Sequence, residues 1–118
     1  MTPRFLRRRE YLEHMLEALR LVRSYTEGLG KVDFLEDKKT QQAVILNLFV
    51  VGEAATRLTE CAPELVVAHP EVEWKAIRGM RNRLAHGYFD VNIDVVWDTV
   101  QLAVPELERH VLRILEEG

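Results

Sequence analysis

The sequence predicts an all-α protein, most simply an up-and-down bundle of helices. Apolar residues recur at helical spacing over long stretches, glycines and prolines fall between these stretches, and no segment keeps a strand-like alternation over a useful length. The 118 residues leave room for about one domain. Because 47% of the residues are hydrophobic, a chain disordered by low hydrophobicity is excluded.

The first predicted helix spans residues 4–27. Its apolar positions are separated mainly by threes and fours, and Arg9 is the gap in a series formed by Phe5, Leu12, Leu16, Leu19 and Val22. Glycines at positions 28 and 30 end this helix, because glycine accepts the left-handed conformation that closes a helix. Phe34 and Leu35 follow, and we expect both to hold a short loop against the core.

The second predicted helix begins at Asp37, a residue type suited to the N-cap, and ends near Cys61. Residues 43–51 are apolar on nearly every side, which predicts a helix covered on several faces. It is either the centre of the bundle, part of a subunit interface, or both. Gly52 would cost about 1 kcal/mol relative to alanine within a helix. We therefore expect another helix to approach closely there.

The remaining chain predicts three more helical segments. Pro63 opens a short turn over residues 63–68, and Pro70 ends it. A third main helix covers residues 74–86. Residues 91–95 alternate like a strand, but apolar residues continue at helical spacing to position 115, so length favours a helix over residues 92–117. Pro105 should kink or break that helix, because it cannot donate to the carbonyl of Gln101.

Charge excludes a protein coated for nonspecific nucleic-acid binding. Sixteen Lys and Arg residues against nineteen Asp and Glu residues give a net charge of −3. Residues 75–83 nevertheless carry four cations and no acid: Lys75, Arg78, Arg81 and Arg83. Any attraction to phosphate must therefore come from this local cluster.

The single cysteine, Cys61, excludes an internal disulfide and lacks the Cys/His spacing of a zinc site. The basic N-terminus has no apolar segment after it, as a secretory signal would. The longest apolar stretch, residues 43–51, is too short to span a bilayer. We expect a soluble cytoplasmic protein with no membrane association, no metal and no cofactor. His14, His69 and His110 have no motif around them, and we expect them on the surface.

Residues 78–88 carry the candidate chemistry. On a helix, Arg78, Asn82 and His86 share one face, whereas Arg81 lies about 140° around from His86. Two arrangements would bring Arg81 and His86 together. The helix could loosen at Gly87, or two copies of the helix could meet across a twofold axis, which would also double the cations around one groove.

Such a pairing suits RNA cleavage. A neutral imidazole can take the proton of a ribose 2′-hydroxyl, and a guanidinium can hold a phosphate and its developing charge through paired hydrogen bonds. A second histidine, from the partner chain, could protonate the leaving 5′-oxygen, so the reaction needs no metal. The same residues are also compatible with an ordinary solvated helix face, and the spacing of residues leaves both interpretations open.

The segment from Arg81 to Tyr88 matches the pattern Arg-x4-His-x-Tyr. It resembles the HepT family of HEPN-domain toxins, the ribonuclease partners of minimal nucleotidyltransferase (MNT) antitoxins in prokaryotes. The similarity extends along most of the chain, over residues 40–48, 52–55, 69–74, 79–82, 96–100 and 105–107. It is therefore more specific than the short motif alone.

The resemblance implies a single HEPN domain over residues 1–118, a bundle of four to five helices that forms a homodimer. The resemblance also implies that the chain is the toxin of a type VII-like toxin–antitoxin system. Such a toxin is a metal-independent endoribonuclease with RNA as its substrate. Arg81 and His86 become the candidate catalytic pair, and Tyr88 becomes the acceptor of adenylate groups from the MNT antitoxin. Arg78, Asn82 and Arg83 are further candidates for binding RNA phosphates.

The sequence leaves two further points open, an alternative function for the chain and the role of Glu53. The chain could be a noncatalytic HEPN module that only binds, as the partner subunit of a nucleotidyltransferase. Glu53, a carboxylate in the apolar second helix, is expected to pair with an arginine such as Arg57 rather than to take part in the active site.

Overall fold

The computed structural model describes residues 3–117, apart from the side chains of Arg4 and Phe5. Phe5, the first apolar position predicted for the first helix, therefore lies outside the described side chains. Within this range the chain forms helices and no strand, which confirms the all-α prediction. The elements are α1 (Arg4–Thr26), α2 (Lys31–Leu35), α3 (Lys38–Cys61), α4 (Pro63–Ala68), α5 (Trp74–His86), the 3-10 turn η1 (Tyr88–Asp90), α6 (Ile93–Asp98), the π-helical segment η2 (Thr99–Ala103) and α7 (Val104–Glu116).

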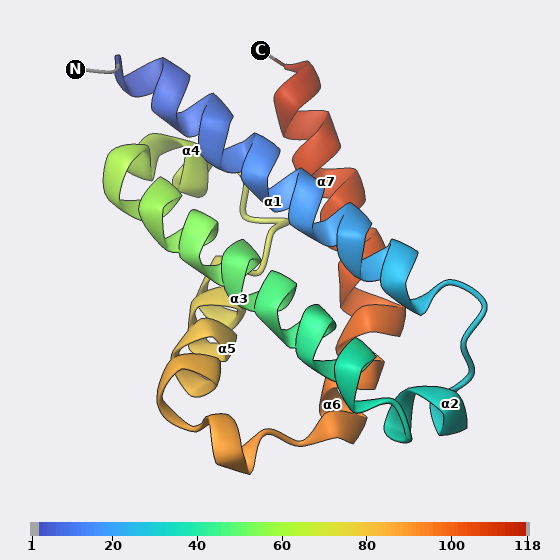
Figure 1. Cartoon of the computed structure of the whole chain (residues 1–118). Helices are drawn as coiled ribbons and strands as arrows, with labels where there is room; N and C mark the ends of the chain where they lie inside the picture. Colours follow the sequence, from blue (N-terminus) through green and yellow to red (C-terminus); the bar gives the residue numbers. More distant parts are fainter. Residues whose placement is uncertain (1–2, 118) are drawn as a thin grey trace.

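The long helices pack in the order α5, α3, α1, α7. Helix α1 contacts both α3 and α7, and α3 also contacts α5 (Figure 1). The bundle is not closed between α5 and α7, which do not form a main packing pair. The C-terminal end of α5 and η1 lie at the end of the molecule away from the start of α1 and the end of α7 (Figure 1).

Three residues of the apolar stripe predicted for the first helix are buried, and Leu16 is half-buried. Leu12, Leu19 and Val22 are at most 3% exposed, and α1 packs against both α3 and α7. The helix ends at Thr26, and Gly28 follows with a φ of 79°, a left-handed conformation that glycine adopts without steric cost. The predicted helix and its end are therefore confirmed.

The segment after Gly30 is a short helix, α2, rather than the predicted loop. Phe34 is fully buried and its ring centroid lies 5.3 Å from that of Trp97, so this side chain does anchor the segment to the core. The Nε2 group of Gln41 donates to the carbonyl oxygens of Phe34 (2.9 Å) and Leu35 (3.1 Å). The prediction was wrong for the Leu35 side chain, which is 38% exposed.

Helix α3 begins where the sequence predicts. Asp37 is the N-cap, and its carboxylate accepts from the backbone N–H of Thr40 at 3.1 Å and from the Thr40 hydroxyl at 2.6 Å. These hydrogen bonds lower the pKa of Asp37. Between α1 and α5 the helix buries eight residues, but Leu46 is 62% exposed and Val50 is half-buried. One apolar strip of α3 is therefore only partly covered within the described chain.

The C-terminal helical segment covers almost the predicted range, residues 93–116. Its irregular turn lies just before Pro105, where the sequence predicts a kink or break. Asn92 caps α6, since its Oδ1 accepts from the backbone N–H groups of Asp94 (2.9 Å) and Val95 (3.3 Å). Residues 99–103 form a π turn, in which the N–H of Val104 donates to the carbonyl of Thr99. Pro105 lies in the first turn of α7, where a missing N–H costs least. The wider π turn absorbs the register change that a proline imposes.

Candidate active site

Helix α5 carries most of the predicted site residues, and apolar anchors fix its rotation. Trp74, Ile77 and Leu84 are buried, and the indole N–H of Trp74 donates to the carbonyl of His69 at 2.9 Å. The helix stays regular through His86, because the N–H of Gly87 donates to the carbonyl of Arg83 at 2.7 Å. The predicted loosening of the helix therefore does not reach His86.

The anchors turn a polar stripe of α5 toward solvent. Arg78, Asn82 and His86 are all exposed and follow one another at i,i+4 spacing, as predicted. Lys75 is exposed on the same side. Neither Lys75 nor Arg78 forms an ion pair within residues 3–117. The stripe therefore presents cations that no acid of the described chain neutralises.

Arg81 faces α3 rather than the stripe. A Cβ added to Gly52 would lie 2.4 Å from the Cβ and 2.9 Å from the Cγ of Arg81, a separation that no real pair of atoms tolerates. Helices α3 and α5 can therefore approach this closely only because Gly52 has no side chain. This confirms the close approach predicted from that glycine and identifies its partner as Arg81.

Two polar side chains of α3 hold the guanidinium of Arg81. Its Nε lies 3.1 Å from Oε1 of Glu53, and its Nη2 donates to the hydroxyl of Thr56 at 3.2 Å. The Thr56 hydroxyl in turn donates to the carbonyl of Gly52 at 2.8 Å. The Nε atom is buried and not aligned with any acceptor, so its contact with Glu53 is an ion pair rather than a hydrogen bond.

The position of Glu53 corrects a prediction. Arg57, its expected partner, pairs instead with Glu60 at 3.2 Å. Glu53 contacts the candidate catalytic arginine, and sequence reasoning gave this residue too little weight. The signal available in the sequence was the spacing of Gly52, Glu53 and Thr56, which places all three near one side of a helix.

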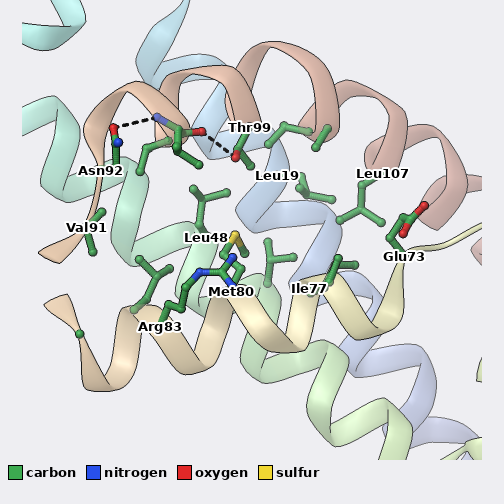
Figure 2. Close-up of a pocket in the computed structure, with 18 of the residues that line it drawn as sticks. Leu19, Leu48, Glu73, Ile77, Met80, Arg83, Val91, Asn92, Thr99 and Leu107 are labelled. Carbon is green, nitrogen blue, oxygen red and sulfur yellow. Dashed lines mark hydrogen bonds between the residues drawn. The ribbon is translucent and has the colours of Figure 1, made fainter.

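Arg83 lies on a third side of α5, about 200° around the helix from Arg81. It lines an apolar pocket of about 570 Å³ between α5 and the segment from α6 to α7. Leu19 and Leu48 also line this pocket (Figure 2). Figure 2 shows the Arg83 side chain beside Met80, directed into this pocket. The structure therefore separates Arg83 from Arg81, although the two are close in sequence.

Tyr88 and Phe89 form the turn η1 directly after the motif. Tyr88 is 46% exposed and Phe89 is 99% exposed, and their rings meet edge to face with centroids 6.1 Å apart. A tyrosine with this exposure can be reached by another protein. Tyr88 lies at the same end of α5 as His86.

Within one chain the predicted site residues do not converge. Arg78, Asn82 and His86 share the exposed face, whereas Arg81 points to α3 and lies about 140° around α5 from His86. The pairing of Arg81 and His86 across a twofold axis stays a prediction.

The other histidines differ from expectation in part. His14 is exposed, as predicted. His69 and His110 are mostly buried, with side chains 14% and 18% exposed. His69 lies 2.9 Å from Glu71 and 3.2 Å from Glu117. Hydrogen bonds from its own backbone N–H and from His69 lower the pKa of Glu71. Among residues 3–117, no three His, Cys, Asp or Glu side chains gather closely enough to hold a metal ion.

None of the described helices is both long enough and apolar enough to cross a bilayer.

Comparison with known proteins finds one family whose model matches, described as "Ribonuclease HepT-like", over residues 15–114. A protein of Thermococcus cleftensis named "Probable ribonuclease HepT" is 40% identical over 100 residues, covering 85% of this chain and 88% of that protein. Two proteins named "Putative RNase" are 37% and 35% identical over 109 residues. Each of these two matches spans 92% of this chain. The match covers 95% of the protein from Caldanaerobacter subterraneus subsp. tengcongensis and 88% of the protein from Methanocaldococcus jannaschii. No solved structure matches.

Proposed function

Because the chain belongs to the HepT-like ribonuclease family, we propose that it is a metal-independent endoribonuclease acting through Arg81 and His86. The observation that carries the proposal is the exposed face of α5. In a chain with a net charge of −3, this helix presents His86 beside cations that no described acid neutralises. A helix face of that kind attracts an RNA backbone locally while the rest of the surface does not.

The proposed reaction is an internal transfer at the phosphate. His86 takes the proton of the 2′-hydroxyl, the 2′-oxygen forms a bond to phosphorus, and the bond from phosphorus to the 5′-oxygen breaks. A second His86, from the partner subunit, gives its proton to the leaving 5′-oxygen. Arg81 binds the phosphate oxygens and stabilises the negative charge that develops on them. The products carry a 2′,3′-cyclic phosphate and a 5′-hydroxyl.

The reaction as proposed needs a homodimer. Two features support it. The partly covered strip of α3 provides an apolar surface, formed by Leu46, which is 62% exposed, and the half-buried Val50. Glu53 continues this strip at helical spacing, so a partner seated on it would come close to Arg81. Arg78 and Asn82 then line the groove between the two copies of α5 and bind RNA phosphates. Arg83 can bind a phosphate there only when its side chain leaves the apolar pocket.

The proposal predicts RNA cleavage by the purified protein in the presence of EDTA. The expected result is a set of fragments with 2′,3′-cyclic phosphate ends, identified by mass spectrometry. The chelator excludes a contaminating metal-dependent nuclease as their source. A protein that binds RNA but leaves it intact would instead be the noncatalytic HEPN module, the partner subunit of a nucleotidyltransferase.

We further propose that the protein is the toxin of a type VII-like toxin–antitoxin system, silenced when an MNT antitoxin adenylylates Tyr88. The exposure of the Tyr88 side chain supports this role. Each adenylate would add bulk and a negative phosphate at the end of α5 that carries His86. It would therefore block RNA by occupancy and by repulsion.

Co-expression with the MNT partner is expected to raise the intact mass by whole adenylate units and to lower RNA cleavage. The Tyr88→Phe variant should keep the unmodified mass and stay active beside the partner. Tyr25→Phe is the matched control, since Tyr25 is 40% exposed but lies on α1. If Tyr88→Phe gains the same mass as the wild type, another residue is the acceptor.

A further inference from the structure

Glu53 has one charged partner within the described chain, the guanidinium of Arg81. Arg57, four residues further along α3, is the ion-pair partner that helical spacing would give Glu53. Its Nη1 pairs instead with Glu60. The Glu53 side chain is 38% exposed and that of Arg81 is 21% exposed. The pair is thus partly exposed, although the Nε atom of Arg81 is buried, and is not a contact of the apolar core.

The contacts with Glu53 and Thr56 occupy one edge of the guanidinium. An arginine side chain offers five N–H donors in a fixed plane, and Nε and Nη2 lie along the same edge of it. Nε faces Glu53 and Nη2 donates to Thr56. The end of the plane, formed by Nη1 and the second N–H of Nη2, makes no hydrogen bond within residues 3–117. That end has the two parallel donors that bind a phosphate bidentately.

The close packing at Gly52 fixes the start of the same side chain. The Cβ and Cγ of Arg81 lie against the bare backbone of Gly52, and the Thr56 hydroxyl is itself held by the carbonyl of Gly52. An unrestrained arginine loses rotamer entropy when it binds, because its long side chain must settle in one conformation. Here the folded chain restrains both the stem and one edge of the head before any phosphate arrives.

We propose that Glu53 and Thr56 are positioning residues for Arg81, which hold its guanidinium so that the Nη1–Nη2 end faces the scissile phosphate. This role rests on the proposed nuclease function. It carries an electrostatic cost, because the Glu53 carboxylate repels the phosphate that Arg81 binds. The cost gives the proposal a kinetic signature, since a residue that only stabilised the fold would not oppose binding of the substrate.

The test compares Glu53→Gln with Glu60→Gln, which removes the same charge from the other ion pair on α3. The substrate is a fluorescently labelled single-stranded RNA. Glu53→Gln is expected to lower kcat by about ten- to a hundredfold, because small displacements of a catalytic group cost that much. KM should stay equal or fall, since the repulsion is gone. Thr56→Val should also lower kcat, and Thr56→Ser, which restores the hydroxyl, should recover it.

A second measurement does not depend on cleavage. In ¹H–¹⁵N NMR spectra, the Nε–H signal of Arg81 should report a rigid side chain in the wild type and a mobile one in Glu53→Ala. An Arg81 that stays equally rigid in Glu53→Ala overturns the positioning role. So does a kcat of Glu53→Gln equal to that of Glu60→Gln in an active protein. A wild type that cuts no RNA overturns the nuclease function itself, and with it the catalytic use of a rigid Arg81.

Discussion

Replacing His86 with alanine is expected to slow RNA cleavage by about 10²- to 10⁴-fold, the usual contribution of a general acid–base group. Arg81→Ala should cost about 10²- to 10³-fold, the effect of removing a donor that stabilises developing charge. Cleavage rates at saturating RNA measure both effects. Since the two residues would act on one phosphate, the double variant should be little slower than the slower single variant.

The chain supplies matched controls for both substitutions. His14 is an exposed histidine on α1, and Arg57 is an exposed arginine of α3 in its own ion pair. His14→Ala and Arg57→Ala should therefore cleave RNA at the wild-type rate. Equal rates for His86→Ala and His14→Ala would remove His86 from the mechanism.

Mixing the two inactive proteins distinguishes a site within one chain from a site between two. Across a twofold axis, a dimer of one Arg81→Ala chain and one His86→Ala chain keeps one Arg81–His86 pair but lacks the second His86 that protonates the leaving oxygen. The mixture should therefore cut RNA faster than the His86→Ala protein and more slowly than the wild type. Within a single chain every pair would be broken and the mixture would stay inactive. The angle of about 140° between the two residues on α5 favours recovery.

Gly52→Ala is expected to lower the free energy of unfolding by about 1–3 kcal/mol, the cost of forcing extra volume into a packed contact. This outcome opposes helix propensity, which alone would favour alanine by about 1 kcal/mol. The new Cβ would lie 2.4 Å from the Cβ of Arg81 and 3.3 Å from its Cα, so α3 and α5 must move apart. RNA cleavage should fall as well, because the same movement displaces Arg81.

Gly79→Ala is the matched substitution on α5. Its Cβ would meet only the Nη1 of Arg83, at 3.6 Å, an ordinary van der Waals contact. Its stability should equal the wild type or exceed it by up to about 1 kcal/mol. Urea unfolding followed by circular dichroism measures both variants. Equal midpoints for Gly52→Ala and wild type would show that the helices can separate there without cost.

The main helices could be predicted because local rules determine them. Asp37 caps α3 through a hydrogen bond to a residue three positions away, and Gly28 turns the chain after α1 through its own left-handed conformation. Both features depend only on neighbouring residues. Helix α2 could not be found this way, because five residues are too few to show a helical period. The π turn before Pro105 is a change of hydrogen-bond register that leaves the apolar pattern almost unaltered.

The candidate site was predicted less completely than the fold, since its key contact joins two helices. Sequence spacing assigns Glu53 to Arg57, its neighbour at i+4, whereas the structure assigns it to Arg81. That choice depends on how closely α3 and α5 approach, which Gly52 decides. The exposed face of Arg78, Asn82 and His86 needed only the helical repeat, and the structure shows it as predicted.

The opening of the bundle between α5 and α7 has a consequence for local unfolding. Helix α1 is covered by α3 and α7, whereas α5 rests mainly on α3 and borders the pocket on its other side. Detaching α5 therefore breaks fewer packing contacts than detaching α1, and its amide hydrogens should exchange with solvent at a lower opening free energy. The helix that carries the candidate chemistry should then open more readily than α1 does.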